Sequence, residues 1–223
     1  MKTRFLFRTI LVIVVLVFAV LVFRSIMRPE RFRAVYELRS KEIQLRLSAI
    51  RSAQTVYKNE FKVFASDIDS LVDFVENGKV VIIKNIGEIP DKMTEKEAFE
   101  KGLLRKEEIL IPAKDRILEL DPTVKLEDFQ YIPFTDKQKK FEIQVRNLES
   151  QTYKIMVYRI DVPLDDILVN MERSVQPENV NVFQGFYNYL LYSGLEDEDQ
   201  YRVQYKPIWL GSLTEASITG SWE

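Results

Sequence analysis

The sequence contains no cysteine and no histidine among its 223 residues. These absences exclude thiol nucleophiles, disulfide bonds, Ser-His-Asp triads and zinc sites built from His or Cys. Catalysis would have to use carboxylates, Lys, Tyr, Ser or Thr. The sequence has no GxGxxG, GxxxxGK[ST], HExxH or GxSxG motif that would place such groups. We therefore predict that the protein is not an enzyme and holds no cofactor or metal.

Glycine and proline are also scarce, with 7 and 8 residues, whereas 46% of the chain is hydrophobic. A disordered chain would be richer in Pro, Gly and charge and poorer in apolar residues. About 195 residues follow the first apolar segment, which is enough for one large domain. We therefore expect the remainder of the chain to fold.

The longest apolar run extends from Ile10 to Phe23, with basic residues on both sides. Counted from Phe5, the run has 19 residues, and a helix of that length at about 1.5 Å per residue spans the hydrocarbon core of a bilayer. A cleaved signal peptide would need a small-residue cleavage site, and bulky, charged residues follow instead. Residues 1–28 are thus predicted to be an uncleaved membrane anchor in contact with lipid, with its apolar surface formed by Ile10, Val14, Val17 and Leu21.

Charge is unevenly distributed along the chain. Residues 1–60 carry 12 Lys and Arg against 4 Asp and Glu, whereas the remainder carries 20 against 30. A basic segment beside an anchor suits an anionic membrane surface, and an acidic body argues against nucleic acid as a partner. The positive-inside rule does not decide the orientation, because four positive groups flank each end of the apolar run.

Residues 29–62 form an amphipathic pattern. Apolar residues recur at spacings of three and four, which predicts one stripe along a helix: Ile43, Leu47, Ile50, Gln54, Tyr57 and Phe61, extended upstream by Phe32 and Tyr36. The opposite face is predicted to carry the basic residues Arg39, Lys41, Arg46, Arg51 and Lys58. Pro29 indicates a kink or a new helix start. The stripe could be a coiled-coil seam or could pack against the chain's own domain, and we expect the second.

Residues 63–223 are predicted to be one α+β body of mostly antiparallel strands with short helices. A helix should begin at Ser66-Asp67 and end at Gly78 in a left-handed conformation. Thr94 with Glu97 indicates a capping box, for a helix that closes at Gly102. Strands are predicted at 79–86, 109–112 and 201–210, a hairpin at 141–146 and 153–158, and a short helix at 164–171.

Three clusters could carry chemistry. The acidic run 196–199 could bind calcium, but it lacks the spacing of an EF-hand loop, so we interpret it as a solvated loop. Asp165-Asp166 could be half of a catalytic carboxylate pair, but adjacent acids at a helix start are ordinary capping. The aromatic segment 183–192 could be core or could bind a peptide or glycan through Tyr187 and Tyr189.

The N-terminal third resembles a known family. The pattern Arg46-Leu47, Ile50 to Gln54, Tyr57, Phe64, Asp67 and Leu71 is similar to that of type IV pilins and the pseudopilins of type II secretion. The resemblance implies an apolar helix that leaves the inner membrane, an amphipathic continuation, and an outward-facing head in which an antiparallel sheet packs on that helix. The chain lacks the family's Gly–Phe cleavage site and the Glu within its apolar segment, so we carry over architecture and orientation but no functional residue.

These observations predict a single-pass inner-membrane protein with its body outside the cytoplasm. It would act as a pilin-like structural or interaction subunit of an envelope assembly, and its protein partners could include further copies of the same chain. Three alternatives stay open: an anchored binding module for a glycan or peptide, an adaptor whose body faces the cytosol, and a carboxylate-based enzyme.

Overall fold

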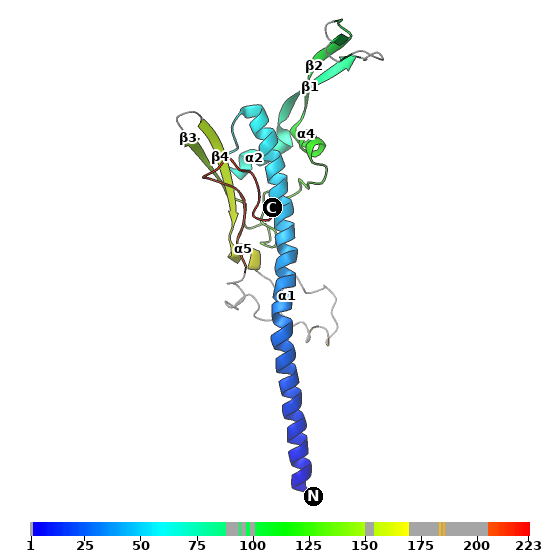
Figure 1. Ribbon diagram of the computed structural model, residues 1–223, viewed down its shortest axis with the longest axis vertical. Coiled ribbons are helices and arrows are strands. Elements are labelled where there is room, and N and C mark those ends of the chain that lie inside the picture. Colours follow the sequence, from blue (N-terminus) through cyan, green and yellow to red (C-terminus); the bar gives the residue numbers. More distant parts are fainter. Residues whose placement is uncertain are drawn as a thin grey trace.

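The structure is a computed structural model, and it describes residues 2–87, 94, 97–98, 101–149, 154–169, 183, 185 and 205–223. Its longest element is α1 (Lys2–Phe61), one helix that runs through most of the height of the molecule in Figure 1. Its 60 residues at about 1.5 Å each give a length of about 90 Å. Because α1 continues through Pro29, the new helix start considered for that position does not occur.

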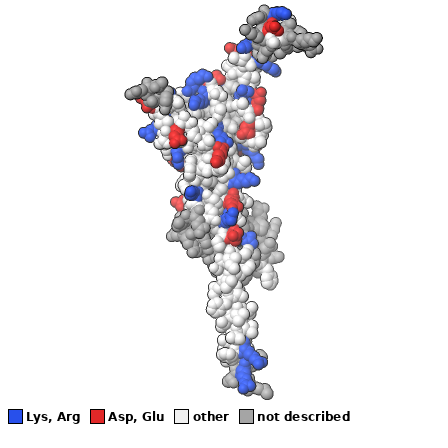
Figure 2. Space-filling model, in the orientation of Figure 1, with Lys and Arg blue, Asp and Glu red and all other residues white. Residues whose placement is uncertain are grey.

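The N-terminal part of α1 projects from the body and contacts no other described element. Every side chain from Leu6 to Phe23 is exposed. Figure 2 shows this part as a surface without acidic residues, with Lys and Arg near its tip. It is the one helix in the described part of the chain that is long and apolar enough to cross a membrane, with a mean hydropathy of 3.0 over its most apolar window.

The C-terminal part of α1 forms the centre of the core. Elements pack on it from several directions, namely α2 (Ile68–Asn77), α4 (Ala113–Leu120), α5 (Leu164–Leu168) and β5 (Ile208–Gly211). For this reason the buried face is wider than one stripe and also includes small residues that let neighbours approach closely. The fully buried residues are Phe32, Arg39, Ile43, Leu47, Ala49, Ile50, Ala53 and Gln54.

A turn stabilised by Gln54 sends the chain back along α1. The Gln54 amide donates to the carbonyl of Ala65 at 3.0 Å and accepts from the Ala65 amide at 2.9 Å. Both polar atoms of this buried side chain are thus paired, which removes the cost of burying them. The turn leads into α2, whose first turn is capped by Asp67 through a 2.7 Å bond from the Ser70 amide.

The end of α2 corrects one prediction. Gly78 has φ of −69°, an extended conformation, and not the left-handed one expected from the sequence. Glycine is needed there for space, since a Cβ atom at position 78 would lie 2.3 Å from the carbonyl oxygen of Phe74. Gly102, with φ of +70°, does take the left-handed conformation, and Thr94 and Glu97 form the reciprocal bonds of a capping box.

The described residues form two antiparallel sheets. In the first, β1 (Lys79–Gly87) pairs with β2 (Leu104–Pro112) along its whole length, and this ribbon projects past the end of α1 (Figure 1). In the second, β3 (Ile143–Glu149), β4 (Lys154–Val162) and β5 pair in the order β3-β4-β5. The described part of the chain is therefore α+β, with a long apolar N-terminal helix followed by antiparallel sheets and short helices, as predicted.

The sequence predicts that Tyr153, Ile155 and Val157 alternate with Lys154, Met156 and Tyr158 on the two faces of this strand, but the buried residues of β4 do not follow that alternation. Tyr158 and Ile160 are buried in the core, at 1% and 0% exposure, and Ile160 pairs with Ile143 of β3. Tyr158 packs edge-on against Phe64, with ring centroids 4.7 Å apart. A tyrosine that the sequence pattern grouped with polar Lys154 is thus part of the core, because residues 64–65 close over β4 after the chain reversal.

Candidate functional site

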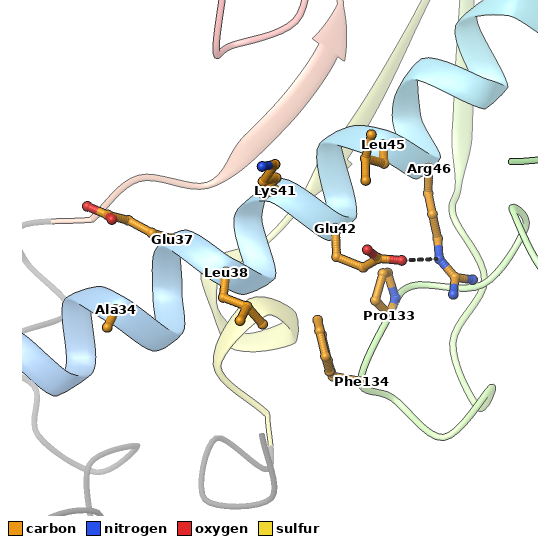
Figure 3. Close-up of a pocket in the computed structure, with 9 residues that line it drawn as sticks. All are labelled: Ala34, Glu37, Leu38, Lys41, Glu42, Leu45, Arg46, Pro133 and Phe134. Carbon is orange, nitrogen blue, oxygen red and sulfur yellow. Dashed lines mark ion pairs between the residues drawn. The ribbon is translucent and has the colours of Figure 1, made fainter. Parts of the chain in front are cut away.

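A groove of about 760 Å³ runs along the exposed side of α1 (Figure 3). We call it the stem groove. Its lining consists of seven α1 residues and two loop residues: Ala34, Glu37, Leu38, Lys41, Glu42, Leu45, Arg46, Pro133 and Phe134.

Exposed residues on α1 form one stripe beside this groove. From position 29 to position 58, the exposed α1 residues lie within an arc of about 140° around the helix axis, with Arg33 and Leu38 at its two ends, and the body covers the other residues wholly or in part. The exposed residues are Glu30, Arg33, Ala34, Glu37, Leu38, Lys41 and Leu45. Leu38 and Leu45 are 58% and 43% exposed. Two leucines seven residues apart lie on the same side of a helix, so the stripe carries an apolar ridge that no described residue covers.

The opposite wall is a loop held in a strained conformation. Phe134 has φ of +68°, a left-handed conformation that costs a bulky residue about 1–3 kcal/mol. The strain is sustained by the next residue, since the Thr135 hydroxyl donates to the Ile132 carbonyl at 2.7 Å. Figure 3 shows Leu38 and Glu42 pointing toward Pro133 and Phe134. The loop therefore places an apolar surface against the helix side of the groove.

Arg39 of α1 contacts the Phe134 ring of this loop, and its buried position contradicts the sequence prediction. We predicted Arg39 on the solvated face, but it is 0% exposed. Its guanidinium donates to the Ile167 and Val169 carbonyls at 2.8 Å and 2.5 Å, and its Cζ lies 4.6 Å from the centre of the Phe134 ring. A buried charge requires such partners. Arg39 thus joins α1, the end of α5 and the groove loop.

Ion pairs and polar bonds fix the rim of the stem groove. Arg46 lies 4.0 Å from Glu42, and it also donates to the carbonyls of Asp128 and Tyr131, which tie the loop to α1. Nearer the anchor, Arg33 pairs with Glu37 at 2.7 Å. This hydrogen bond raises the pKa of Arg33 further above its ordinary range. The groove therefore has an apolar floor between charged groups of both signs.

The residues named from the sequence fall in different environments. Ile10, Val14, Val17 and Leu21 are all exposed on the projecting part of α1. Among the stripe residues, Ile43, Leu47 and Ile50 are fully buried, whereas Phe61 is 52% exposed. Tyr57 is partly buried, and its ring lies 4.6 Å from that of Phe61 and 5.0 Å from that of Phe74.

The other candidate clusters contribute nothing to the stem groove. Tyr187, Tyr189 and the acidic run 196–199 lie outside the described residues. Asp166 is 8% exposed and accepts a 2.5 Å bond from Lys139, a structural ion pair beside α5. Within the described ranges, no group of three or more acidic side chains is placed to hold a metal ion.

Sequence reasoning missed the loop residues of the groove, because nothing in Pro133-Phe134 indicates contact with residues nearly a hundred positions earlier. A signal for Leu38 and Leu45 was present, since both are apolar at heptad spacing yet lie off the main stripe. Comparison of the chain with protein-family models, with curated proteins and with solved structures gives no match.

Proposed function

We propose that this protein is a single-pass, membrane-anchored structural or interaction subunit of a cell-envelope assembly, pilin-like in architecture and without catalytic activity. One observation carries the proposal. A single helix exposes an unbroken run of apolar side chains from Ile10 to Phe23 and serves as the centre of a folded core along its C-terminal part. Such a helix is both anchor and scaffold, so the body is held at a fixed distance from the bilayer.

The position of the stem groove supports an interaction role. Ala34 follows Phe23 by 11 residues, so the groove begins about 17 Å beyond the end of the apolar run. This distance places it just outside the headgroups of a membrane that the run would span. A neighbouring protein anchored in the same membrane can therefore reach it without crossing the body.

We assign the stem groove to a second copy of this chain. Copies inserted in one membrane hold their α1 helices parallel. Ala34, Leu38, Lys41 and Leu45 follow spacings of four, three and four, which is the repeat that parallel helices use to pack side by side. Charge also fits, because Lys41 of one copy would approach the carboxylates of Glu37 and Glu42 on the other.

The first test is the side of the membrane on which the body lies. The chain has no cysteine, so a single Glu215→Cys substitution at an exposed position accepts one label. We expect a thiol reagent that cannot cross the inner membrane to label Glu215→Cys in intact cells. A Val14→Cys control, within the apolar run, should stay unlabelled.

Labelling of Glu215→Cys only after lysis would place the body in the cytosol and overturn the envelope role. A membrane-tethered cytosolic adaptor would then be the better account.

The second test addresses the second copy. Oxidation of membranes that contain Leu38→Cys should give a covalent dimer. Arg33→Cys is the matched control, because Arg33 is also exposed but lies about 8 Å nearer the N-terminus along α1 and about 140° around the helix from Leu38. A strict monomer with both variants, or equal dimer yields from both, would count against a specific contact between copies in the stem groove.

A further inference from the structure

The β1–β2 ribbon at the far end of the body has two open edges of different character. Among the described residues, β1 pairs only with β2, and β2 only with β1. The β2 edge has a run of four charged residues from Arg105 to Glu108 and ends at Pro112, features that discourage pairing with another strand. In contrast, β1 has four consecutive apolar residues, from Val80 to Ile83, between single lysines at positions 79 and 84, and it contains no proline.

The direction of the β1 amides shows which groups face the open edge. The Val81 amide points away from β2, since it donates to Glu60 Oε2 at 3.4 Å. Alternate residues of an antiparallel strand direct their N–H and C=O groups to the same side. The backbone groups of Ile83 therefore face the open edge together with those of Val81. A 3.4 Å bond is long and weak, so Glu60 leaves this edge available to a better partner.

A groove of about 510 Å³ follows this same edge. One side of it consists of β1 residues 80–84, and the other consists of side chains from the end of α1 and from α4, namely Val56, Asn59, Glu60, Arg116 and Glu119. Arg116 and Glu119 neutralise each other in a 2.7 Å ion pair. Glu60 is thus the acidic group placed to meet a basic residue on a chain that lies along β1.

The exposed face of the ribbon is apolar beside this edge. Val81 and Ile83 are 45% and 64% exposed, and Leu110, the cross-strand partner of Val81, is 65% exposed. A strand added to β1 would place alternate side chains next to this face and the others toward the α1 and α4 wall. Such a strand would cover apolar surface and satisfy the open backbone groups at once.

We propose that the open edge of β1 is a docking site for an extended segment of a different protein, which adds to the ribbon as a third strand. The segment has apolar residues at alternate positions and a Lys or Arg that pairs with Glu60. Backbone pairing supplies affinity in this mode of recognition, and side chains supply specificity.

A second copy of this chain is the weaker candidate. Pairing of two β1 edges across a two-fold axis requires antiparallel strands. In Figure 1, β1 runs away from the N-terminal end of α1, so copies anchored in one membrane direct β1 the same way. This choice of occupant rests on the anchoring proposed above, whereas the availability of the edge does not.

The test uses the purified full chain in lipid nanodiscs and a synthetic probe. The probe is an acetylated and amidated octapeptide of alternating Val and Thr with one central Lys. Amide hydrogen exchange is followed by NMR at four consecutive residues of β1. At about 1 mM probe, we expect exchange at Val81 and Ile83 to slow by about tenfold, while Val80 and Ile82, already bonded to β2, stay unchanged. The same peptide N-methylated along one edge should have no effect.

Two variants make the assignment specific. Ile83→Pro removes an amide that faces the open edge, so it should abolish probe binding and leave the ribbon paired. Its matched control, Ile82→Pro, removes an amide bonded to β2 and should release the ribbon itself. Glu60→Gln should weaken the Lys-containing probe several-fold and leave a Lys-free probe unchanged.

The proposal fails if the probe does not slow exchange at Val81 and Ile83, or if these amides are already as slow as Val80 without probe. It fails equally if Ile83→Pro binds the probe as the wild type does. These outcomes do not depend on the side of the membrane or on the stem groove, so they separate this proposal from the proposed function.

Discussion

Replacement of Arg39 by alanine tests whether one buried charge holds the body to α1. Arg39 lies in the centre of the core at 0% exposure, and its guanidinium donates to two carbonyls at the end of α5. Truncation to alanine would leave both carbonyls without this donor, remove the group beneath the Phe134 ring and open a cavity beside α1. We therefore expect the change to loosen α5 and the loop wall of the stem groove together.

The magnitude follows from three contributions. Each hydrogen bond from a charged donor contributes about 1.5–3 kcal/mol, and the lost side-chain volume adds the cost of a cavity. Removal of the charge returns part of its desolvation cost. The net expectation for Arg39→Ala is a loss of about 2–4 kcal/mol in the free energy of unfolding. Arg39→Met fills the space without a charge, so it should lose about half as much.

Urea unfolding of the full chain in a nonionic detergent would measure these losses by tryptophan fluorescence. The chain has two tryptophans, Trp209 and Trp222, and both belong to the body, so the signal reports on the body alone. Arg33→Ala is the control, because its ion pair with Glu37 is exposed and should contribute little to stability. An Arg39→Ala loss no larger than that of Arg33→Ala would refute the reasoning.

Three further substitutions test other parts of the core. Tyr158→Phe should raise the free energy of unfolding by about 1 kcal/mol in the same assay, because no described residue pairs with the buried Tyr158 hydroxyl; a loss would reveal an unseen partner. Gly78→Ala should lower the thermal midpoint through a loss of about 1–3 kcal/mol, since the added Cβ would meet the Phe74 carbonyl, and an unchanged midpoint would contradict this. The Arg51 hydrogen bond lowers the pKa of Glu223 below its ordinary value of 4.5. The ion pair between Glu223 and Arg51 therefore contributes fully to stability above pH 4.5, and this contribution is lost as the pH falls through the lowered pKa. Glu223→Gln should thus make the free energy of unfolding fall less steeply at acid pH than in the wild type. An equally steep fall in both proteins would refute the assignment.

The error at Arg39 shows where sequence reasoning failed on α1. The spacing Phe32, Tyr36, Arg39, Ile43, Leu47 alternates between four and three until its last step. Position 39 therefore belonged to the apolar stripe, and only the charge of its side chain assigned it to the opposite face. The spacing was the better guide, because the backbone carbonyls after α5 provide the bonds that a buried guanidinium needs.

Elements whose ends carry capping or turn residues were easier to predict than elements without such residues. The helix after Asp67 and the strand after Gly78 were placed closely, since capping residues define their ends. β2 was recognised only at its apolar end, because residues 105–108 are all charged and pair along an exposed ribbon. α4 was missed because its apolar residues occupy too few turns to show a helical period.

The stem groove could not be predicted from the sequence, because its two walls come from distant parts of the chain. Its loop wall lies far from α1 in sequence. Arg46 joins the loop to α1 through the carbonyls of Asp128 and Tyr131, whereas Arg39 lies against the Phe134 ring and bonds carbonyls at the end of α5. Every residue has a backbone carbonyl, so the pattern of charged side chains in the sequence does not indicate which carbonyls these arginines bond.

The distribution of covered and open surface links the two proposed sites. Among the described residues, the body covers α1 from position 29 to position 58 except for one stripe, so the proposed neighbour in the same membrane would reach the stem through the stripe that contains Leu38 and Leu45. The β1 edge lies at the opposite end of the body, far from the N-terminal part of α1 (Figure 1), where the proposed partner would not have to share the membrane. Because these surfaces lie at opposite ends of the body, a substitution in one should leave the other unchanged. Leu38→Glu should therefore abolish contact between copies without altering the hydrogen exchange of Val81, and a coupled change would mean that the ribbon and the stem move together.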